Sequence, residues 1–243
     1  MRQSSTTKVT SDATGAAFDK FAAPAALAYF ALYFIYQILY IDLVSELNHW
    51  LTLVLVPATI VFLGLRFTTG RTGARAFFRT FNLHFDHFGK ALLVALIAGV
   101  VLGFVQLLLS RSAGAILESI KSGEYFYKLP IALLAMLATA GFTEEFFFRG
   151  FIQTSLERRT RSRLWSVGVS SLLFGIYHFP YAYYKESWPT HGDFLGAVSE
   201  GVVFSTVIGV ILGGLYSRWK NLFIPILVHA LFNAIWFATK INL

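Results

Sequence analysis

Seven stretches of mostly apolar residues dominate the chain, and each is near the roughly 20 residues that a helix needs to cross a membrane. They cover about 21–41, 50–67, 89–110, 129–152, 164–183, 194–216 and 221–239. Only 14% of the residues are charged, against about 25% in a typical soluble domain. The sequence therefore predicts an all-α fold, a polytopic transmembrane helix bundle with about seven spans.

These stretches leave little chain for a separate soluble domain. Residues 1–20 are small and polar without an apolar run, which predicts a flexible N-terminal tail. No low-complexity linker divides the remainder, so residues 21–243 are predicted to form a single transmembrane domain. The chain contains no cysteine, which excludes disulfides, thiolate metal ligands and cysteine nucleophiles. Any chemistry is expected inside the membrane.

The distribution of the charged residues along the sequence indicates how the chain is oriented in the membrane. The chain has 20 Lys and Arg residues against 13 Asp and Glu residues, an excess that can indicate nucleic-acid binding. Here the cations lie beside the ends of the predicted spans and form no single patch. The connections on one side contain only Arg111, Lys121, Lys128, Lys185 and Lys240, and nearly all other cations lie on the opposite side. The positive-inside rule therefore predicts a cytoplasmic N-terminus, and no nucleic-acid partner is expected.

Few ionisable residues lie within the predicted spans, where each charge costs on the order of 3 kcal/mol. The fourth span contains Glu144, Glu145 and Arg149 in TEEFFFRG. At about 100° per residue, Glu145 lies near Arg149 on the helix surface, whereas Glu144 lies far round it. Glu145 is therefore predicted to pair with Arg149, which leaves Glu144 as a buried carboxylate suited to general-base catalysis. A snorkelling surface pair at a helix end is the alternative explanation.

Two later spans contain further polar side chains. The fifth contains His178, with Phe174 one helical turn earlier and placed to pack over the imidazole. The seventh contains His229 and Asn233, which share one helix face. Each motif alone is explained equally well by hydrogen bonds between helices. Together, a carboxylate, two imidazoles and an amide from three spans predict one site at membrane depth.

In chain order the motifs are EExxxR at 144–149, FxxxH at 174–178 and HxxxN at 229–233. They resemble the three motifs of the type II CAAX prenyl endopeptidases, in the wider CPBP or Abi family of intramembrane proteases. The resemblance places a protease-like core at about 129–239. It implies a hydrolase, an endopeptidase that cuts a membrane-associated protein or peptide, which in the eukaryotic members is a prenylated CAAX protein.

The resemblance also implies roles for individual residues. The catalytic residues would be Glu144, His178, His229 and Asn233, with Glu145 and Arg149 as a supporting ion pair. Glu144 would take a proton from an attacking water that His178 helps to activate. His229 and Asn233 would stabilise the oxyanion.

Whether the enzyme uses a metal is a separate question. Glu144, His178 and His229 would be a sufficient ligand set for catalytic zinc, and the resemblance admits a metalloprotease. However, the chain has no HExxH motif, and carboxylates that would orient zinc-bound histidines are hard to identify in the sequence. No cofactor is therefore the favoured prediction, with zinc as the alternative.

Two other function classes fit the sequence less well. A non-catalytic membrane adaptor of the Abi type would have the same fold without turnover. An ion-coupled transporter would use the intramembrane polar groups as a relay, but it predicts polar residues along most spans, and the first three are almost purely apolar. The short loops favour a multi-pass protein of a prokaryotic plasma (inner) membrane.

Overall fold

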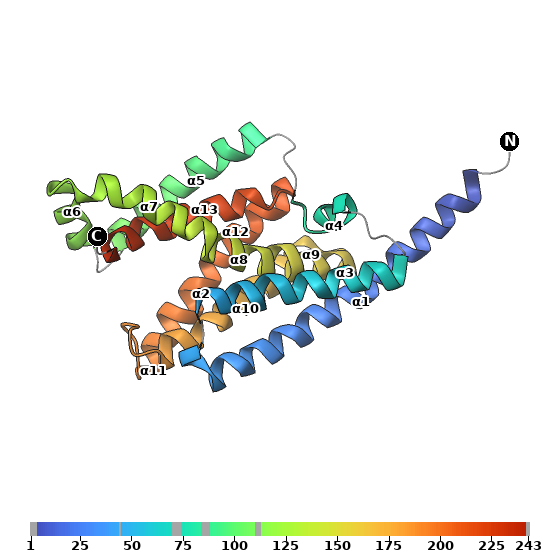
Figure 1. Cartoon of the computed structure of the whole chain (residues 1–243), viewed down its shortest axis with the longest axis horizontal. Coiled ribbons are helices and arrows are strands. Elements are labelled where there is room, and N and C mark those ends of the chain that lie inside the picture. The colour runs from blue at the N-terminus through green and yellow to red at the C-terminus, as the bar shows by residue number, and fades with distance from the viewer. Residues whose placement is uncertain (1–3, 44, 70–73, 84–87, 110–112, 242–243) are drawn as a thin grey trace.

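The computed structural model describes residues 4–241 apart from 44, 70–73, 84–87 and 110–112. Every regular element in this part of the chain is a helix, which confirms the predicted all-α class. The first half contains α1 (Ser4–Leu39), η1 (Ile41–Leu43), α2 (Glu46–His49), η2 (Trp50–Leu55), α3 (Val56–Thr69), α4 (Ala74–Thr80), α5 (Phe88–Leu109) and α6 (Ala113–Lys121). The second half contains α7 (Glu124–Ala138), α8 (Ala140–Glu145), η3 (Phe146–Gln153), α9 (Thr154–Thr160), α10 (Arg163–Tyr184), α11 (Phe194–Gly196), η4 (Ala197–Phe204), α12 (Ser205–Trp219), α13 (Phe223–Phe237) and η5 (Ala238–Lys240). Figure 1 shows the helices as one elongated bundle, from which the start of α1 projects.

The start of α1 differs from the sequence prediction. Helix α1 begins at Ser4, so residues 4–20 are helical where a flexible tail is predicted. Adding a residue to an existing helix costs far less than nucleating one, and the apolar part of α1 from Phe18 onward supplies that nucleus. The mobility of this polar segment stays a prediction.

Six helical segments of the described chain are long and apolar enough to cross a membrane. They are Phe18–Leu39, Leu47–Thr68, Phe88–Val105, Glu124–Thr160, Phe194–Trp219 and Phe223–Lys240, and each overlaps a predicted span. Helix α10 covers the other predicted span, 164–183, but is not among the six, because serine, tyrosine and histidine make its sequence more polar. The helical bundle is confirmed, whereas the predicted count of about seven spans and the location of the termini stay predictions.

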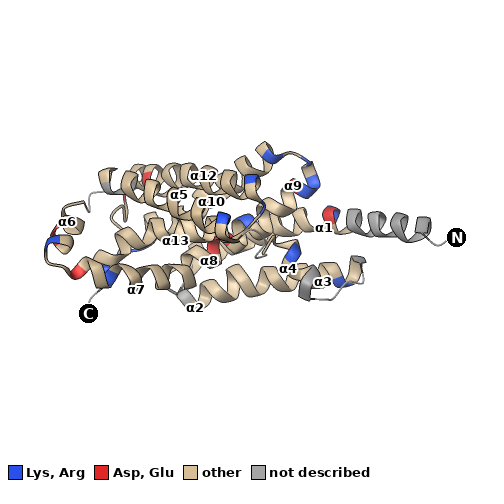
Figure 2. Cartoon of the chain, turned by 90° about the horizontal axis from the view of Figure 1, so that it is seen from above, with Lys and Arg blue, Asp and Glu red and all other residues tan. Residues whose placement is uncertain are grey.

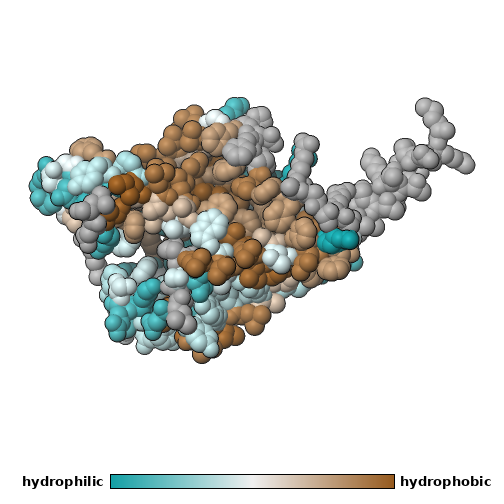
Figure 3. Space-filling view, in the orientation of Figure 1, coloured by the Kyte–Doolittle hydropathy of each residue, from teal (hydrophilic) through white to brown (hydrophobic). Residues whose placement is uncertain are grey.

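The surface and the core of the bundle are distinct. Large apolar side chains, such as Leu93, Ile97 and Val100 of α5, are exposed, as expected for a lipid-facing surface. Figure 3 shows this apolar surface across the middle of the molecule, with hydrophilic residues toward its ends. Inside, α1, η3 and α10 meet in an aromatic core, where Tyr33 stacks on Tyr177 with ring centroids 6.1 Å apart.

A break in the fourth predicted span positions the following helix. At Thr139, φ of −113° and ψ of −114° lie outside the helical region, so α7 ends and α8 begins. A Cβ atom at Gly141 would lie 2.7 Å from the carbonyl oxygen of Met136 and 3.0 Å from the Cβ of Ala230 in α13. Glycine therefore allows α8 to approach α13 closely, and α13 also packs against α5, α7 and α12.

Candidate active site

Glu144, near the end of α8, has a carboxylate with one unsatisfied oxygen. Its side chain is 9% exposed. Oε1 accepts a hydrogen bond from the hydroxyl of Tyr177 at 3.4 Å, whereas the buried Oε2 has no hydrogen-bond partner among the described residues. Leaving a buried carboxylate oxygen without a donor costs stability. Oε2 is therefore the atom of this carboxylate that can still accept a hydrogen bond.

Two histidines face this oxygen from separate helices. Nε2 of His178, in α10, lies 3.8 Å from Oε2 of Glu144, and Nε2 of His229, in α13, lies 4.0 Å from it. Both separations are too long for a direct hydrogen bond but short enough for one water molecule to contact both groups. The structure thus brings together three of the four residues predicted to be catalytic, in one small polar site.

The other ring nitrogen of each histidine is held by an acceptor. Nδ1 of His178 lies 2.8 Å from the carbonyl oxygen of Phe174, and Nδ1 of His229 lies 2.7 Å from Oε1 of Glu145. Because a carbonyl or carboxylate oxygen accepts, each Nδ1 carries the proton, and Nε2 of a neutral ring is an acceptor facing Glu144. The Phe174 ring packs against His178 with centroids 4.6 Å apart, as their spacing predicts.

Glu145 and Arg149 form an ion pair, as their i, i+4 spacing predicts. Nη1 of Arg149 donates to Oε1 of Glu145 at 2.9 Å, and both side chains are 0% exposed. Nη2 donates to the carbonyl oxygen of Gly209 at 3.2 Å, and the guanidinium carbon lies 4.5 Å from the centre of the Phe174 ring. Figure 2 shows acidic residues of α8 inside the bundle. The alternative of a snorkelling surface pair is therefore wrong.

The segment that follows Glu145 is a π-helix, η3, and all eight of its residues are buried. Such turns occur frequently at functional sites. Besides the Arg149 contact, Nε2 of Gln153 donates to the carbonyl oxygen of Gly213 and to Oγ of Ser217, both at 3.0 Å. Two polar side chains of η3 therefore attach it to the backbone of α12.

Asn233 is the fourth residue predicted to be catalytic. It lies one turn after His229 on α13 and is half-buried. Residues four apart project from the same face of a helix, so Asn233 and His229 point to the same side of α13.

Two contributors to the site were not predicted from the sequence. The hydroxyl of Tyr177 donates a hydrogen bond to Glu144. Glu145 accepts a hydrogen bond from His229 as well as from Arg149. Consecutive helical residues point about 100° apart, so the position of Tyr177 next to His178 offered no reason to select it. The link from Glu145 to His229 joins residues 84 positions apart, which only the packing of α8 on α13 brings together.

Glu144, His178 and His229 are the residues of the site that could be ligands of a metal ion. The structure identifies a carboxylate that orients one of these histidines, which was hard to find in the sequence: Glu145 accepts from Nδ1 of His229, as carboxylates often do beside zinc. However, among the residues that the structure describes, no group of three or more His, Cys, Asp or Glu side chains is arranged to hold a metal ion.

Comparison with known families gives a match in the second half of the chain. Residues 126–235 match the family model described as type II CAAX prenyl endopeptidase Rce1-like. The matched region begins in α7, ends in α13 and contains all six residues predicted for the site, and it confirms the family resemblance of the three motifs. No curated protein and no solved structure matches the chain.

Proposed function

We propose that this chain, whose residues 126–235 match the Rce1-like type II CAAX prenyl endopeptidase model, hydrolyses a peptide bond of a membrane-associated protein with a water activated by Glu144 and His178. The observation that carries the proposal is the buried Oε2 of Glu144, which lies 3.8 Å from Nε2 of His178 and has no hydrogen-bond partner in the described structure. The family match supports a CAAX-type protease, and the apolar helices support a multi-pass membrane protein.

The proposed reaction begins with a water molecule between Glu144 and His178. Such a water can donate one hydrogen bond to each acceptor, which leaves an oxygen lone pair free to attack the carbonyl carbon. Glu144 takes a proton as the new C–O bond forms, and negative charge develops on the carbonyl oxygen. When the C–N bond breaks, Glu144 returns this proton to the leaving amine nitrogen.

Asn233 and His229 are the proposed donors to the developing oxyanion. The amide nitrogen of Asn233 donates in every protonation state of the site. Nε2 of His229 donates only when the ring carries a second proton, because the first is held at Nδ1 by Glu145. Glu145 and Arg149 orient His229 and do not contact the substrate in this proposal.

Asn233→Ala is expected to lower kcat about 100- to 1000-fold, because one oxyanion donor is typically worth this much. The thermal unfolding temperature should stay close to that of the wild type, since Asn233 is only half-buried. The measurement is single-turnover cleavage of a prenylated CAAX peptide in nanodiscs. Asn233→Asp, which keeps the shape but removes the amide donor, should be similarly impaired. Wild-type turnover in either variant would contradict the role.

We expect catalysis without a metal cofactor, because Oε2 of Glu144 and Nε2 of His178 are 3.8 Å apart, close enough for one water molecule to donate a hydrogen bond to each. Activity should persist after dialysis against a strong chelator, with far less than one zinc ion per chain by elemental analysis. One zinc per chain, together with activity that is lost on chelation and restored by zinc, would instead assign Glu144, His178 and His229 as ligands.

The substrate class is proposed from the family, as a protein or peptide with a CAAX-like C-terminus, prenylated or not. The test compares the membrane proteomes of cells that produce either the wild type or the Glu144→Gln variant at equal levels. Peptide termini found only with the wild type would support a protease and identify its substrates. Identical termini together with an unchanged cellular phenotype would favour a non-catalytic adaptor of the Abi type.

We also propose that the N-terminus is cytoplasmic and that the membrane is a prokaryotic plasma membrane. The gathering of Lys and Arg near the α4 and α9 end of the bundle supports this orientation (Figure 2). Reporter fusions at the two termini would test it.

A further inference from the structure

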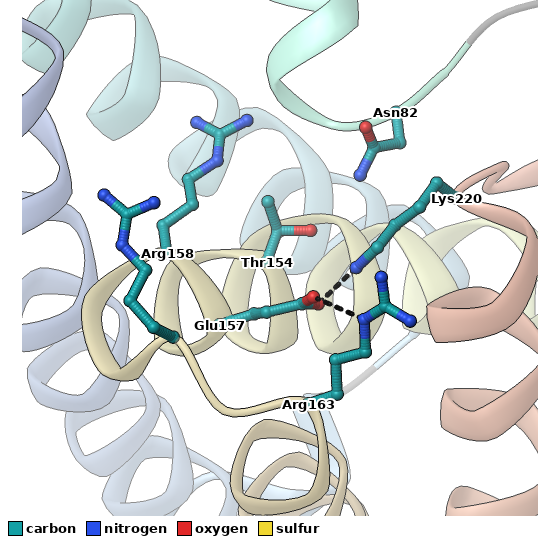
Figure 4. A pocket seen from close by; sticks show the side chains of 7 residues that line it. Asn82, Thr154, Glu157, Arg158, Arg163 and Lys220 are labelled. Atoms are coloured by element: carbon teal, nitrogen blue, oxygen red, sulfur yellow. Dashed lines mark hydrogen bonds and ion pairs between the residues drawn. The ribbon is translucent and has the colours of Figure 1, made fainter. Parts of the chain in front are cut away.

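A second polar feature of the molecule is a pocket of about 330 Å³ at the end of the bundle where α9, α10 and α12 meet (Figure 4). It is lined by Asn82, Thr154, Glu157, Arg158, Arg161, Arg163 and Lys220. Thr154, the lining residue nearest to Glu144 in the sequence, follows it by ten residues, and the whole of η3 lies between them. The pocket is therefore separate from the candidate active site.

The pocket has an excess of positive charge. Four of its lining side chains are cationic, and one, Glu157, is a carboxylate. Glu157 already pairs with Lys220 through Oε2 and lies 3.6 Å from Arg163 through Oε1, as the dashed lines in Figure 4 show. One carboxylate cannot balance four cations, so the pocket attracts an anion.

The remaining two arginines do not change this balance. Nη2 of Arg158 donates to the carbonyl oxygen of Thr80 at 3.0 Å, which satisfies a donor without neutralising the charge. Arg161 lies 3.8 Å from a carboxylate oxygen of Asp19, a long contact for a side chain that is 81% exposed. Exposed pairs of this kind contribute little, so both guanidinium groups remain available to an anion.

The several arginines of the pocket suit a phosphate group better than one cationic side chain would. Arginine offers several N–H donors in a fixed fork that matches phosphate oxygens, and the pocket presents three such groups from α9, α10 and the turn between them. Asn82 adds a neutral amide, which donates one N–H to the hydroxyl of Tyr216 at 2.6 Å and has a second N–H, whereas the hydroxyl of Thr154 already donates to the carbonyl oxygen of Arg149 at 2.8 Å. The lining thus combines cationic forks with neutral hydrogen-bonding groups.

The neighbouring residues place the pocket at the level of lipid headgroups. Trp165 lies two residues after Arg163 and is 63% exposed, and Trp219 directly precedes Lys220 and is 38% exposed. Tryptophan is enriched at membrane–water interfaces. Leu164 is 88% exposed beside them and can contact an acyl chain.

The C-terminal carboxylate of a substrate is a less suitable occupant. Three residues beyond a cut bond extend about 10 Å at most, whereas the arginines of the pocket begin at Arg158, beyond the whole of η3 from Glu144. A phosphate ester at the membrane surface has no such constraint on its position.

We propose that the pocket binds the phosphate group of an anionic glycerophospholipid, whose acyl chains lie against the exposed apolar residues next to it. A soluble phosphate ester offers the same anionic chemistry without the acyl chains, so experiment can distinguish the two sources. The proposal does not depend on peptide hydrolysis.

The experiment measures lipid binding to the full chain in detergent by native mass spectrometry. Phosphatidylglycerol is titrated against phosphatidylcholine with identical acyl chains. The pocket variant is Arg161→Gln/Arg163→Gln, whose side chains are 81% and 69% exposed, so it is expected to fold. The matched control is Arg66→Gln/Arg79→Gln, which removes the same charge from exposed positions outside the pocket. Soluble glycerol phosphate is added as a competitor.

The expected result is preferential binding of phosphatidylglycerol that weakens at least about 10-fold in the pocket variant, because each arginine removed would donate charge-assisted hydrogen bonds to the phosphate. The control should change affinity less than about 2-fold, and glycerol phosphate at equal concentration should not displace the lipid. Equal losses in both variants would overturn the proposal by showing general surface electrostatics. If glycerol phosphate binds as tightly as phosphatidylglycerol, the acyl chains do not contribute to binding, and the proposal that the ligand is a lipid is wrong.

Discussion

Glu144→Gln is expected to lower the rate of peptide hydrolysis by about 10³- to 10⁴-fold, the upper range for loss of a general base. Glutamine keeps the shape of the side chain and can still accept from Tyr177, which donates to Oε1 in the wild type. It cannot take a proton from the attacking water. The measurement is the single-turnover rate on a prenylated CAAX peptide in nanodiscs, where product release does not limit the observed rate.

The control for this variant is Glu118→Gln in α6, which removes one carboxylate that is 73% exposed. It should retain wild-type activity, and both variants should show the helical circular dichroism of the wild type. A Glu144→Gln protein that retains more than about a tenth of the wild-type rate would show that Glu144 is not the base, since 10-fold lies below the usual range for such a group.

Arg149→Met is expected to cause the largest loss of stability, about 3 to 5 kcal/mol, because it leaves the buried Glu145 without its cation. The carbonyl of Gly209 also loses its donor. The measurement is the free energy of unfolding in mixed micelles as the denaturing detergent fraction is raised. The exposed Arg66→Met provides a control, with an expected change within about 0.5 kcal/mol.

The double variant Glu145→Gln/Arg149→Met distinguishes a missing cation from lost packing. It contains no unpaired charge at this position, so it should be more stable than Arg149→Met alone. A double variant less stable than the single one would contradict this account. Its activity should still be low, because the Glu145→Gln substitution removes the carboxylate that holds Nδ1 of His229.

The apolar stretches predicted most of the fold because helix length in a membrane is set by the thickness of the hydrocarbon core. They could not predict the break at Thr139, since Glu124–Thr160 is apolar enough to be read as one segment. Just after the break, Gly141 allows α8 to approach Ala230 of α13 closely, and this packing involves two helices that are far apart in the sequence. Helix α10 is another example: its serines and tyrosines lower its hydropathy, and the sequence alone could not show that several of them face the interior of the bundle.

The candidate site was predicted where local geometry alone determines a contact. Glu145 and Arg149 lie one turn apart, so helical spacing was sufficient to pair them. The bond between Glu145 and His229, and the resulting orientation of the imidazole, depends on how α8 packs against α13. Spacing identified the polar residues of each span, but it could not establish which atoms face one another.

The π-helical geometry of η3 constrains insertions and deletions during evolution. A π-helical turn contains one residue more than the corresponding α-helical turn, so deleting one residue within Phe146–Gln153 would restore an α-helix. The flanks that carry Glu144 and Gln153 would then keep nearly their present facing, because the α-helical turn covers the same span with one residue fewer. Alignments of homologues are therefore expected to place any single-residue gap of this region within Phe146–Gln153, and not in the α-helical segments on either side.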